Sequence, residues 1–444
     1  MKMPSRLNLV LISIFIFAGA HAQSVNSTEE TLRKVADHIL KDAVFGFEGI
    51  DNHQTYTSAK DIPENVAVKY KSPYTGWHYT HGVLNIAMLH LGDYLKDDRY
   101  TKYVQNQVAF GFDNYKVFQQ RFKNDVKHYM YPYGELFTME ELDDFGAMGA
   151  SVMDLYNKVK RPEYKAYAEK AAKHLETERL RLEDGTLACI SPVKNTIWGD
   201  DLYMSVPFLV RMYKLSGNMV YLNDAIKQVL HFNKYLWDDN KQIYWHCYFA
   251  DSKQNGVAHW GRCNGWIALA QANLLSFIPA GHPQRAELIR LLQRQIIGLS
   301  RYQDAEGLWH QLLDKENSYS ESSCSAMFVY TIAKAVNEGW IDKRYASIAT
   351  TGWDALKKYK ITPDGQLKDI CVGTEIRNNL VYYYQRPVGV NEKHGLGALI
   401  DAGVEMLKLE KEQPLKKPVA GKLVKLGFDD VAKNHFSYVS TVFD

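Results

Sequence analysis

Apolar residues recur at helical spacing through most of the chain, and the helices that they predict come in pairs. Each pair is joined by a short turn with glycine, proline or charged residues, which are the residues that end helices. The predicted pairs cover residues 77–96 and 98–117, 139–158 and 161–178, 200–216 and 219–238, 262–278 and 283–302, and 321–338 and 342–359.

The pairs form a repeat, because their first helices begin about sixty residues apart. Two further helices are predicted at 29–43 and 395–411, and they would form a sixth pair that joins the two ends of the chain. Six helical hairpins indicate an all-α fold, the (α/α)6 barrel, in which six inner helices are surrounded by six outer ones. The alternative is an open α-solenoid, which needs polar caps that the pattern does not show. We expect one barrel domain over residues 23–444, with a C-terminal tail at 412–444.

The N-terminal segment lies outside this repeat. Lys2 and Arg6 precede an apolar stretch from Leu7 to about Ala18, and the small-residue sequence Ala-His-Ala follows, ending at Ala22. This order predicts a secretory signal peptide over residues 1–22, cleaved after Ala22. A membrane anchor is the less favoured alternative, because a spanning helix needs about 20 apolar residues. We therefore expect a periplasmic or secreted protein.

Charge and composition narrow the class of partner. The chain has 53 Lys and Arg against 51 Asp and Glu and no basic run, so neither nucleic acid nor a membrane surface is an expected partner. The aromatic content, with 29 Tyr, 18 Phe and 9 Trp, suits stacking on sugar rings. The five cysteines are scattered, and metal-ligand spacing, phosphate loops and dinucleotide fingerprints are not found, so no metal or cofactor is expected. The pattern does not indicate an oligomeric state.

Polar and aromatic residues gather where the predicted inner helices begin. Because those helices run in one direction, their N-termini share one rim of the barrel. The residues at this rim are Trp77, His78, His81, Asp143, Asp144, Trp198, Asp200, Asp201, His259, Trp260, Arg262, Asn264, Trp266, Tyr319, Glu321, Ser323 and His394. An Asp at a helix start is more often a cap, and a lone Trp more often belongs to the core. The mixture of carboxylates, Arg, His and Trp on one rim nevertheless favours a binding or catalytic site.

The chemistry of this mixture suits an acidic sugar. Two carboxyls from neighbouring helices can separate their pKa values, so that one remains protonated as an acid while the other is ionised. An Arg beside a Trp, as in Arg262 and Trp260, offers a fork for a carboxylate and a plane for a ring.

Four strings resemble glycoside hydrolase family 105, the unsaturated rhamnogalacturonyl hydrolases, to which the unsaturated glucuronyl hydrolases of family 88 are related. The strings are TIWGDDLYMSVPFL, HWGRCNGWIALA, SYSESSCSAMFVYTIAKAVNEGWID and YYYQRPVGVNEKHGLGALIDAG. The resemblance covers about residues 70–410 and implies an (α/α)6 barrel. It also implies a reaction in which water adds to the C4=C5 double bond that a polysaccharide lyase leaves on a terminal uronic acid. The product opens to a keto-uronate and releases the aglycone sugar.

The resemblance implies roles for single residues. Asp200 matches the catalytic acid/base, and the second catalytic acid is Asp143 or Asp144, between which the sequence does not decide. Glu321 and His394 join the binding residues by their position on the rim. The substrate-binding residues expected from the resemblance and the rim together are Trp77, His78, His246, Trp260, Arg262, Trp266, Glu321 and His394. Asp201 is expected to be a supporting or capping carboxylate.

The leading hypothesis is an exported hydrolase of lyase-generated oligosaccharides that end in an unsaturated uronic acid, such as unsaturated galacturonyl-rhamnose. The nearest alternative acts on unsaturated glucuronyl ends from ulvan-type or arabinogalactan-type oligosaccharides, because the C4 difference between the two uronates vanishes in the double bond. An epimerase or a lyase on a similar toroid, and a non-catalytic glycan-binding toroid, are the more remote alternatives.

Overall fold

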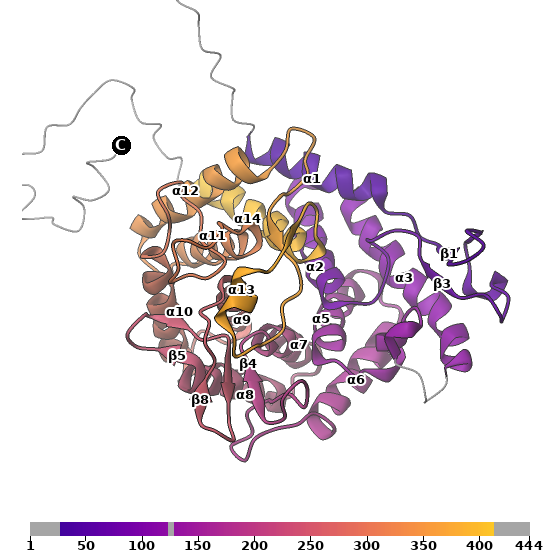
Figure 1. The fold of residues 1–444 in the computed structure, drawn as a ribbon, viewed down its shortest axis with the longest axis horizontal. Coiled ribbons are helices and arrows are strands. Elements are labelled where there is room, and N and C mark those ends of the chain that lie inside the picture. The colour runs from indigo at the N-terminus through magenta and orange to yellow at the C-terminus, as the bar shows by residue number, and fades with distance from the viewer. Residues whose placement is uncertain (1–26, 123–127, 413–444) are drawn as a thin grey trace, which may run out of the picture.

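The computed structural model describes residues 27–122 and 128–412, and within them six helices form an inner ring (Figure 1). The inner helices are α2 (Tyr79–Leu95), α5 (Leu142–Val159), α7 (Asp201–Ser216), α9 (Gly261–Phe277), α11 (Ser322–Asn337) and α14 (Lys393–Glu412). Each packs against the next, and α14 packs against α2, so the ring is closed. The closed ring confirms the barrel prediction and excludes the open solenoid.

An outer layer of helices surrounds this ring. The outer helices are α1 (Thr28–Asp42), α3 (Asp98–Arg121), α6 (Pro162–Thr177), α8 (Met219–Leu236), α10 (Arg285–Ser300) and α12 (Ala346–Ala355). In α1, the buried residues Leu32, Val35, Ala36 and Ile39 follow the spacing of one helix face. That face packs against α14, so the two ends of the described chain form the predicted sixth pair (Figure 1).

The inner helices approach one another closely at glycines. A Cβ added to Gly146 of α5 would lie 2.0 Å from the carbonyl oxygen of Met204 in α7. A Cβ on Gly82 of α2 would lie 2.5 Å from the backbone of Ala147 in α5. At both positions the backbone of the neighbouring helix lies where a side chain would be. The ring therefore closes only with very small residues at these positions.

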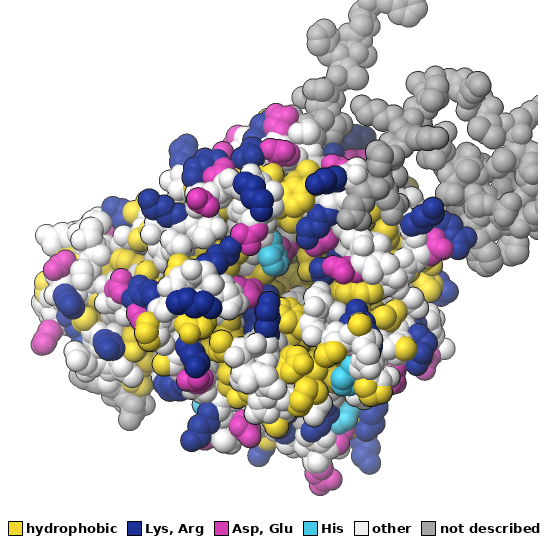
Figure 2. Space-filling model, turned by 180° about the vertical axis from the view of Figure 1, so that it is seen from behind, with side chains coloured by type: hydrophobic (Ala, Val, Ile, Leu, Met, Phe, Trp, Pro, Cys, Tyr) yellow, Lys and Arg dark blue, Asp and Glu magenta, His cyan; other side chains and the backbone are white. Residues whose placement is uncertain are grey.

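The end of the barrel where the inner helices finish is held by ion pairs between neighbouring helices. These pairs are Arg211 with Asp154 at 2.7 Å, His90 with Asp401 at 2.8 Å, and Lys334 with Glu405 at 3.6 Å. On the molecular face seen in Figure 2, side chains of both signs are interspersed with apolar ones. The opposite face, toward the viewer in Figure 1, carries the starts of the inner helices and the segment with α13 (Leu380–Tyr384).

Short strands, which the all-α prediction did not include, connect the hairpins. They are β1 (Phe47–Gly49), β2 (Thr55–Tyr56), β3 (Val68–Tyr70), β4 (Thr196–Trp198), β5 (Trp237–Asp238), β6 (Ile243–Tyr244), β7 (Cys247–Phe249), β8 (Gln254–Asn255), β9 (Ile370–Cys371) and β10 (Val388–Gly389). The sheets are antiparallel, in the orders β2-β1-β3, β4-β7-β8, β5-β6 and β9-β10. Strands of two or three residues are too short to show an alternating pattern, which explains the omission.

The predicted bounds differ from the observed ones by more than two residues in three helices. Helix α5 begins at Leu142 rather than 139, because the short helix α4 (Gly134–Thr138) precedes it. Met139 ends α4 in a left-handed conformation with a φ of 57°, so the helix cannot continue through it. Helix α3 continues to Arg121 rather than 117. The segment predicted as 342–359 starts with a 3-10 turn and ends in a π turn at Leu356–Lys360.

The predicted signal peptide lies outside the described residues, as does the C-terminal tail beyond residue 412. Within the described ranges, none of the helices combines the length and the apolar character that crossing a membrane requires.

We predict that Gly146→Ala destabilises the fold, because the new methyl group would collide with the backbone of Met204 and force α5 away from α7. The expected loss in the free energy of unfolding is about 1–3 kcal/mol, measured by urea denaturation. Gly281→Ala is the matched control, since no atom lies within 4 Å of the added Cβ there. Equal effects of the two substitutions would contradict this view of the ring.

Candidate active site

Asp200 lies at the junction between a strand and an inner helix. Strand β4 ends at Trp198, which pairs with Cys247 of β7, and the Gly199 amide donates to the carbonyl of His246 at 2.9 Å. This pairing places the His246 ring beside Asp200 and leaves 3.1 Å between His246 Nε2 and Asp200 Oδ2. The fold therefore brings these two predicted site residues into contact.

The His246 ring is completely enclosed. Trp260 lies over it with ring centroids 4.7 Å apart, and Trp198 meets it edge-on. On its other side, His246 Nδ1 lies 2.8 Å from the hydroxyl of Tyr383 in α13. Trp260 also stacks on the guanidinium of Arg262 at 4.4 Å. Trp260 thus forms the middle layer between His246 and Arg262.

Asp143 and Asp201 bring two more carboxyls toward Asp200. Burial raises the pKa of Asp143 well above its ordinary value, and the charges of Asp201, Asp144 and Asp200 raise it further. Burial also raises the pKa of Asp201 to about 6, although its Oδ2 accepts a hydrogen bond from Cys189 Sγ at 3.0 Å. Burial and like-charge repulsion therefore both favour the protonated forms of these carboxyls.

Asp144 has a different environment from its neighbour. Its Oδ1 accepts a 2.7 Å hydrogen bond from the amide of Tyr79, the first residue of α2, so it caps an adjacent inner helix. Burial and the charge of Glu135 raise its pKa. The two candidates for the second catalytic acid therefore differ in their partners. Asp143 interacts electrostatically with Asp200, and Asp144 caps α2.

A cavity of about 560 Å³ opens beside Asp144. His78, Lys393 and three tyrosines, Tyr70, Tyr131 and Tyr133, are among its walls. Of the predicted catalytic acids, Asp144 is the one that lines this cavity.

Arg262 is engaged by the chain itself. Its Nη1 donates to the carbonyl of Cys371, and its Nη2 donates to the carbonyl of Val372 at 2.6 Å. Among the described residues, its buried Nε has no hydrogen-bond partner. Nη1 also donates to Ser323 Oγ at 3.3 Å, so in this conformation Arg262 ties residues 371 and 372 to the start of α11.

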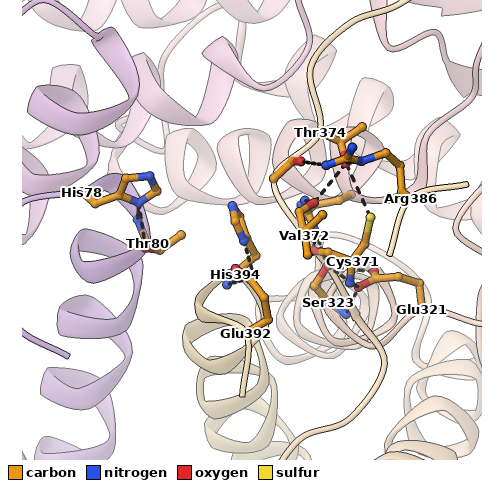
Figure 3. A network of polar contacts seen from close by, with 12 residues as sticks. His78, Thr80, Glu321, Ser323, Cys371, Val372, Thr374, Arg386, Glu392 and His394 are labelled. Carbon is orange, nitrogen blue, oxygen red and sulfur yellow. Dashed lines mark hydrogen bonds and ion pairs between the residues drawn. The ribbon is translucent and has the colours of Figure 1, made fainter. Parts of the chain in front are cut away.

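Glu321 holds the same segment from below, as Figure 3 shows. Its Oε1 accepts from the Cys371 amide at 2.9 Å, and its carboxylate also accepts from the amides of Ser323 and Cys324 at the start of α11. Glu321 is 1% exposed, so its position is that of a helix cap and a tether of the 371–374 segment rather than an open sugar contact.

The remaining predicted residues divide between rim and core. His78 caps α2, and its ring lies 6.3 Å from that of His394, whose Nδ1 pairs with Glu392 (Figure 3). Burial lowers the pKa of His394 to about 4. Trp77 instead donates to the Tyr167 hydroxyl at 3.1 Å, in the packing between inner and outer helices.

Trp266 is buried in the middle of the barrel. It packs on Tyr203 at 4.8 Å and meets Tyr79 edge-on at 6.2 Å. It therefore forms part of the floor beneath the rim, whereas Trp77 is among the residues that line the cavity beside Asp144.

The sequence argument did not identify Tyr383, Tyr79, Lys393 or Glu392. Tyr383 stands in the run YYYQRP, which belongs to one of the strings that carry the resemblance, but nothing local distinguishes it from its neighbours. Its contact with His246 joins residues 137 positions apart. Among the described residues, no group of three or more His, Cys, Asp or Glu has an arrangement that could hold a metal ion.

Comparison with known proteins fixes the family. The model of Glycosyl Hydrolase Family 88 matches residues 53–410. The chain belongs to this family. A solved structure described as a possible member of the GH105 family, from Salmonella enterica serovar Paratyphi A, superposes with a TM-score of 0.70, 23% identity and coverage of 92% of this chain and 100% of that one. This likeness supports the shared fold.

Two curated relatives match over shorter stretches. An unsaturated rhamnogalacturonyl hydrolase of Bacillus subtilis (strain 168) is 30% identical over 219 residues, which are 48% of this chain and 60% of that protein. An unsaturated 3S-rhamnoglycuronyl hydrolase of Alteromonas sp. (strain LOR) is 28% identical over 220 residues, which are 47% of this chain and 51% of that protein. The chain thus spans only about half of the length of the curated relatives it matches.

The raised pKa of Asp201 predicts a stability effect with a definite sign. In the unfolded chain the group ionises near its ordinary value of 3.8, and in the folded protein near 6. The native state therefore loses stability as the pH rises from about 4 through 6, because a charge must form where it is buried. Asp201→Asn removes this loss, so the variant should gain stability relative to the parent by roughly 2 kcal/mol between about pH 4 and pH 7.

Urea unfolding at the two pH values measures this difference. Asp342→Asn is the control of opposite sign, because hydrogen bonds from Arg344 lower the pKa of Asp342. Its relative stability should fall as the pH rises. A pH-independent effect of Asp201→Asn would show that the Asp201 carboxyl is not held protonated by the fold.

Proposed function

We propose that the protein hydrates the C4=C5 double bond of an unsaturated uronic acid at the end of an oligosaccharide. The observation that carries the proposal is the juxtaposition of Asp200, His246 and carboxyls with raised pKa values at the starts of the inner helices. Membership of Glycosyl Hydrolase Family 88 supports it, and so do the names of the two curated relatives.

Asp200 is the acid/base in this proposal. The double bond is a vinyl ether, so C4 accepts a proton and the positive charge at C5 is stabilised by the ring oxygen. Asp200 is the residue of the group that delivers the proton, since its side chain retains 13% exposure while Asp201 and His246 are enclosed. Water then bonds to C5 and gives its proton to Asp200, which returns to its starting form.

The rest of the reaction needs little from the protein. The C5 hydroxyl formed by hydration makes a hemiketal, which opens by breaking the bond from C5 to the ring oxygen. A ketone forms at C5, and the former ring oxygen remains on C1 as a hydroxyl, so that C1 is now a hemiacetal. This hemiacetal then collapses to an aldehyde by breaking the bond between C1 and the aglycone oxygen. One water is consumed, and the products are a keto-uronate and the free aglycone sugar.

Asp143 is the second carboxyl in this proposal. Because burial and neighbouring carboxylates raise its pKa, its protonated form is favoured, and in that form it can donate a hydrogen bond to the sugar or to Asp200. Asp144 is assigned to capping α2 and to the wall of the cavity.

Unsaturated galacturonyl-rhamnose is the substrate that we propose first, following the Bacillus relative. The Alteromonas relative favours a second candidate, an unsaturated uronic acid linked to 3-sulfated rhamnose. We also propose that residues 1–22 direct export and are removed after Ala22, on the basis of their charge and apolar order. N-terminal sequencing of the mature protein, with Gln23 as the expected first residue, tests the export proposal.

Loss of the ultraviolet absorbance of the conjugated double bond tests the proposed reaction. Hydration removes the chromophore, a lyase creates it, and binding or epimerisation leaves it unchanged. We expect the protein to remove it from the rhamnose-linked disaccharides. Asp200→Asn should lower kcat by about 10²- to 10⁴-fold, because the amide cannot carry the proton. Full activity of this variant would falsify the assignment of Asp200.

The same assay separates the two neighbouring carboxyls. Asp143→Asn should lower kcat by at least about tenfold with little change in thermal stability, since the group acts on the reaction. Asp144→Asn should mainly lower stability, by about 1 kcal/mol, because it weakens the cap of α2. The reverse pattern, with Asp144→Asn losing turnover and Asp143→Asn losing only stability, would reassign the second acid.

A further inference from the structure

Tyr383 connects the segment in front of the barrel to the candidate acid. Its hydroxyl lies 2.8 Å from His246 Nδ1, and His246 Nε2 lies 3.1 Å from Asp200 Oδ2. Its backbone is fixed as well, because Gln311 Nε2 donates to its carbonyl at 2.9 Å. Tyr383 is 1% exposed, so its hydroxyl meets protein groups and not bulk water.

The hydrogen-bond direction follows from the donors that surround the phenol. The amide of Arg377 donates to the Tyr383 oxygen at 3.3 Å, so that oxygen already serves as an acceptor. Burial raises the pKa of Tyr383 far above its ordinary value, so the phenol retains its proton. The hydroxyl then satisfies its one proton by donating to His246 Nδ1.

The tautomer of His246 follows in turn. If Nδ1 accepts from Tyr383, the ring proton lies on Nε2, which then donates to Asp200 Oδ2. The opposite tautomer would leave the Tyr383 proton without an acceptor and point a bare nitrogen at a carboxylate. A doubly protonated ring would likewise leave the phenol proton unpaired in a buried place, which is costly.

We propose that Tyr383 is a positioning residue that acts through His246, fixing the ring as the Nε2–H tautomer so that it occupies Asp200 Oδ2 and leaves Oδ1 for the reacting proton. The catalytic consequence rests on the proposed function. The tautomer itself does not, because it is a property of the protein without substrate.

Other titratable groups from the surrounding elements also interact electrostatically with Asp200, and the substitution tested below leaves them in place. They are Tyr79, Asp143, Asp201, Cys247, Arg262 and Cys263. None of them contacts the Tyr383 hydroxyl in the hydrogen bonds of the described residues, so Tyr383→Phe changes the His246 contact without replacing these groups.

Nitrogen NMR of the full-length protein with ¹⁵N-labelled histidine tests the tautomer directly. We expect the His246 signals, identified as those lost in His246→Asn, to show a protonated Nε2 and an unprotonated Nδ1 at neutral pH. Tyr383→Phe should shift these signals toward a mixture of tautomers. Tyr384→Phe should leave them unchanged, because its hydroxyl contacts Asn317 at the surface. A protonated Nδ1 in the parent protein would overturn the proposal.

Kinetics tests the consequence. Tyr383→Phe should lower kcat about tenfold and leave KM within about twofold, because one buried hydrogen bond that orients Asp200 is lost. The alkaline limb of the kcat/KM profile should move to higher pH, since an unprotonated Nε2 would accept the proton of Asp200 and keep it bound.

A merely structural role of Tyr383 would lower thermal stability without moving the pH profile, and this outcome would contradict the proposal. Tyr384→Phe serves again as the control and should retain parental kinetics. If no unsaturated uronide is consumed by the parent protein, the proposed function fails while the NMR experiment still decides the tautomer.

Discussion

The close approach of neighbouring inner helices is the constraint on which the rest of the structure depends. Gly146 and Gly82 let α5 meet α7 and α2 at backbone distance, and α14 closes the ring against α2. Closure brings the starts of six helices, separated by some sixty residues each, to one rim. The pairing of β4 with β7 brings Asp200 and His246 together, and the packing of α5 against α7 adds Asp143 from the preceding hairpin.

Concentrating polar groups at this rim has an electrostatic consequence. Carboxyls at the starts of the inner helices are buried, and burial favours their protonated forms, which is why the pKa values of Asp143 and Asp201 are raised. Arg262 and Glu321 do not simply face the open rim. They hold the segment 371–374 across it through backbone hydrogen bonds, so the charged groups that shape the site also fix its cover.

The family strings and the geometry contribute different kinds of information about single residues. The resemblance assigns roles to Asp200, His246 and Trp260, which meet in the structure. Trp77, to which the resemblance also gave a role, packs against Tyr167 and lines the cavity, and Glu321, expected from its place on the rim, caps α11. A motif preserves a residue type without stating which neighbour it serves, and Asp143 and Asp144 illustrate this, since adjacent positions on one helix point their carboxyls at different partners.

Helical periodicity and the spacing of turns determined the barrel, its six hairpins and the rim on which the acids lie, because burial of one helix face is a local, repeating requirement. The short strands, the bend at Met139 and the partners of each polar group were decided only by the tertiary structure. The link from Tyr383 through His246 to Asp200 joins residues that are far apart in sequence. Its hydrogen bonds require atoms to be placed to within a few tenths of an ångström. No periodic pattern in a chain encodes distances of that kind, so only the packed barrel could assign these contacts.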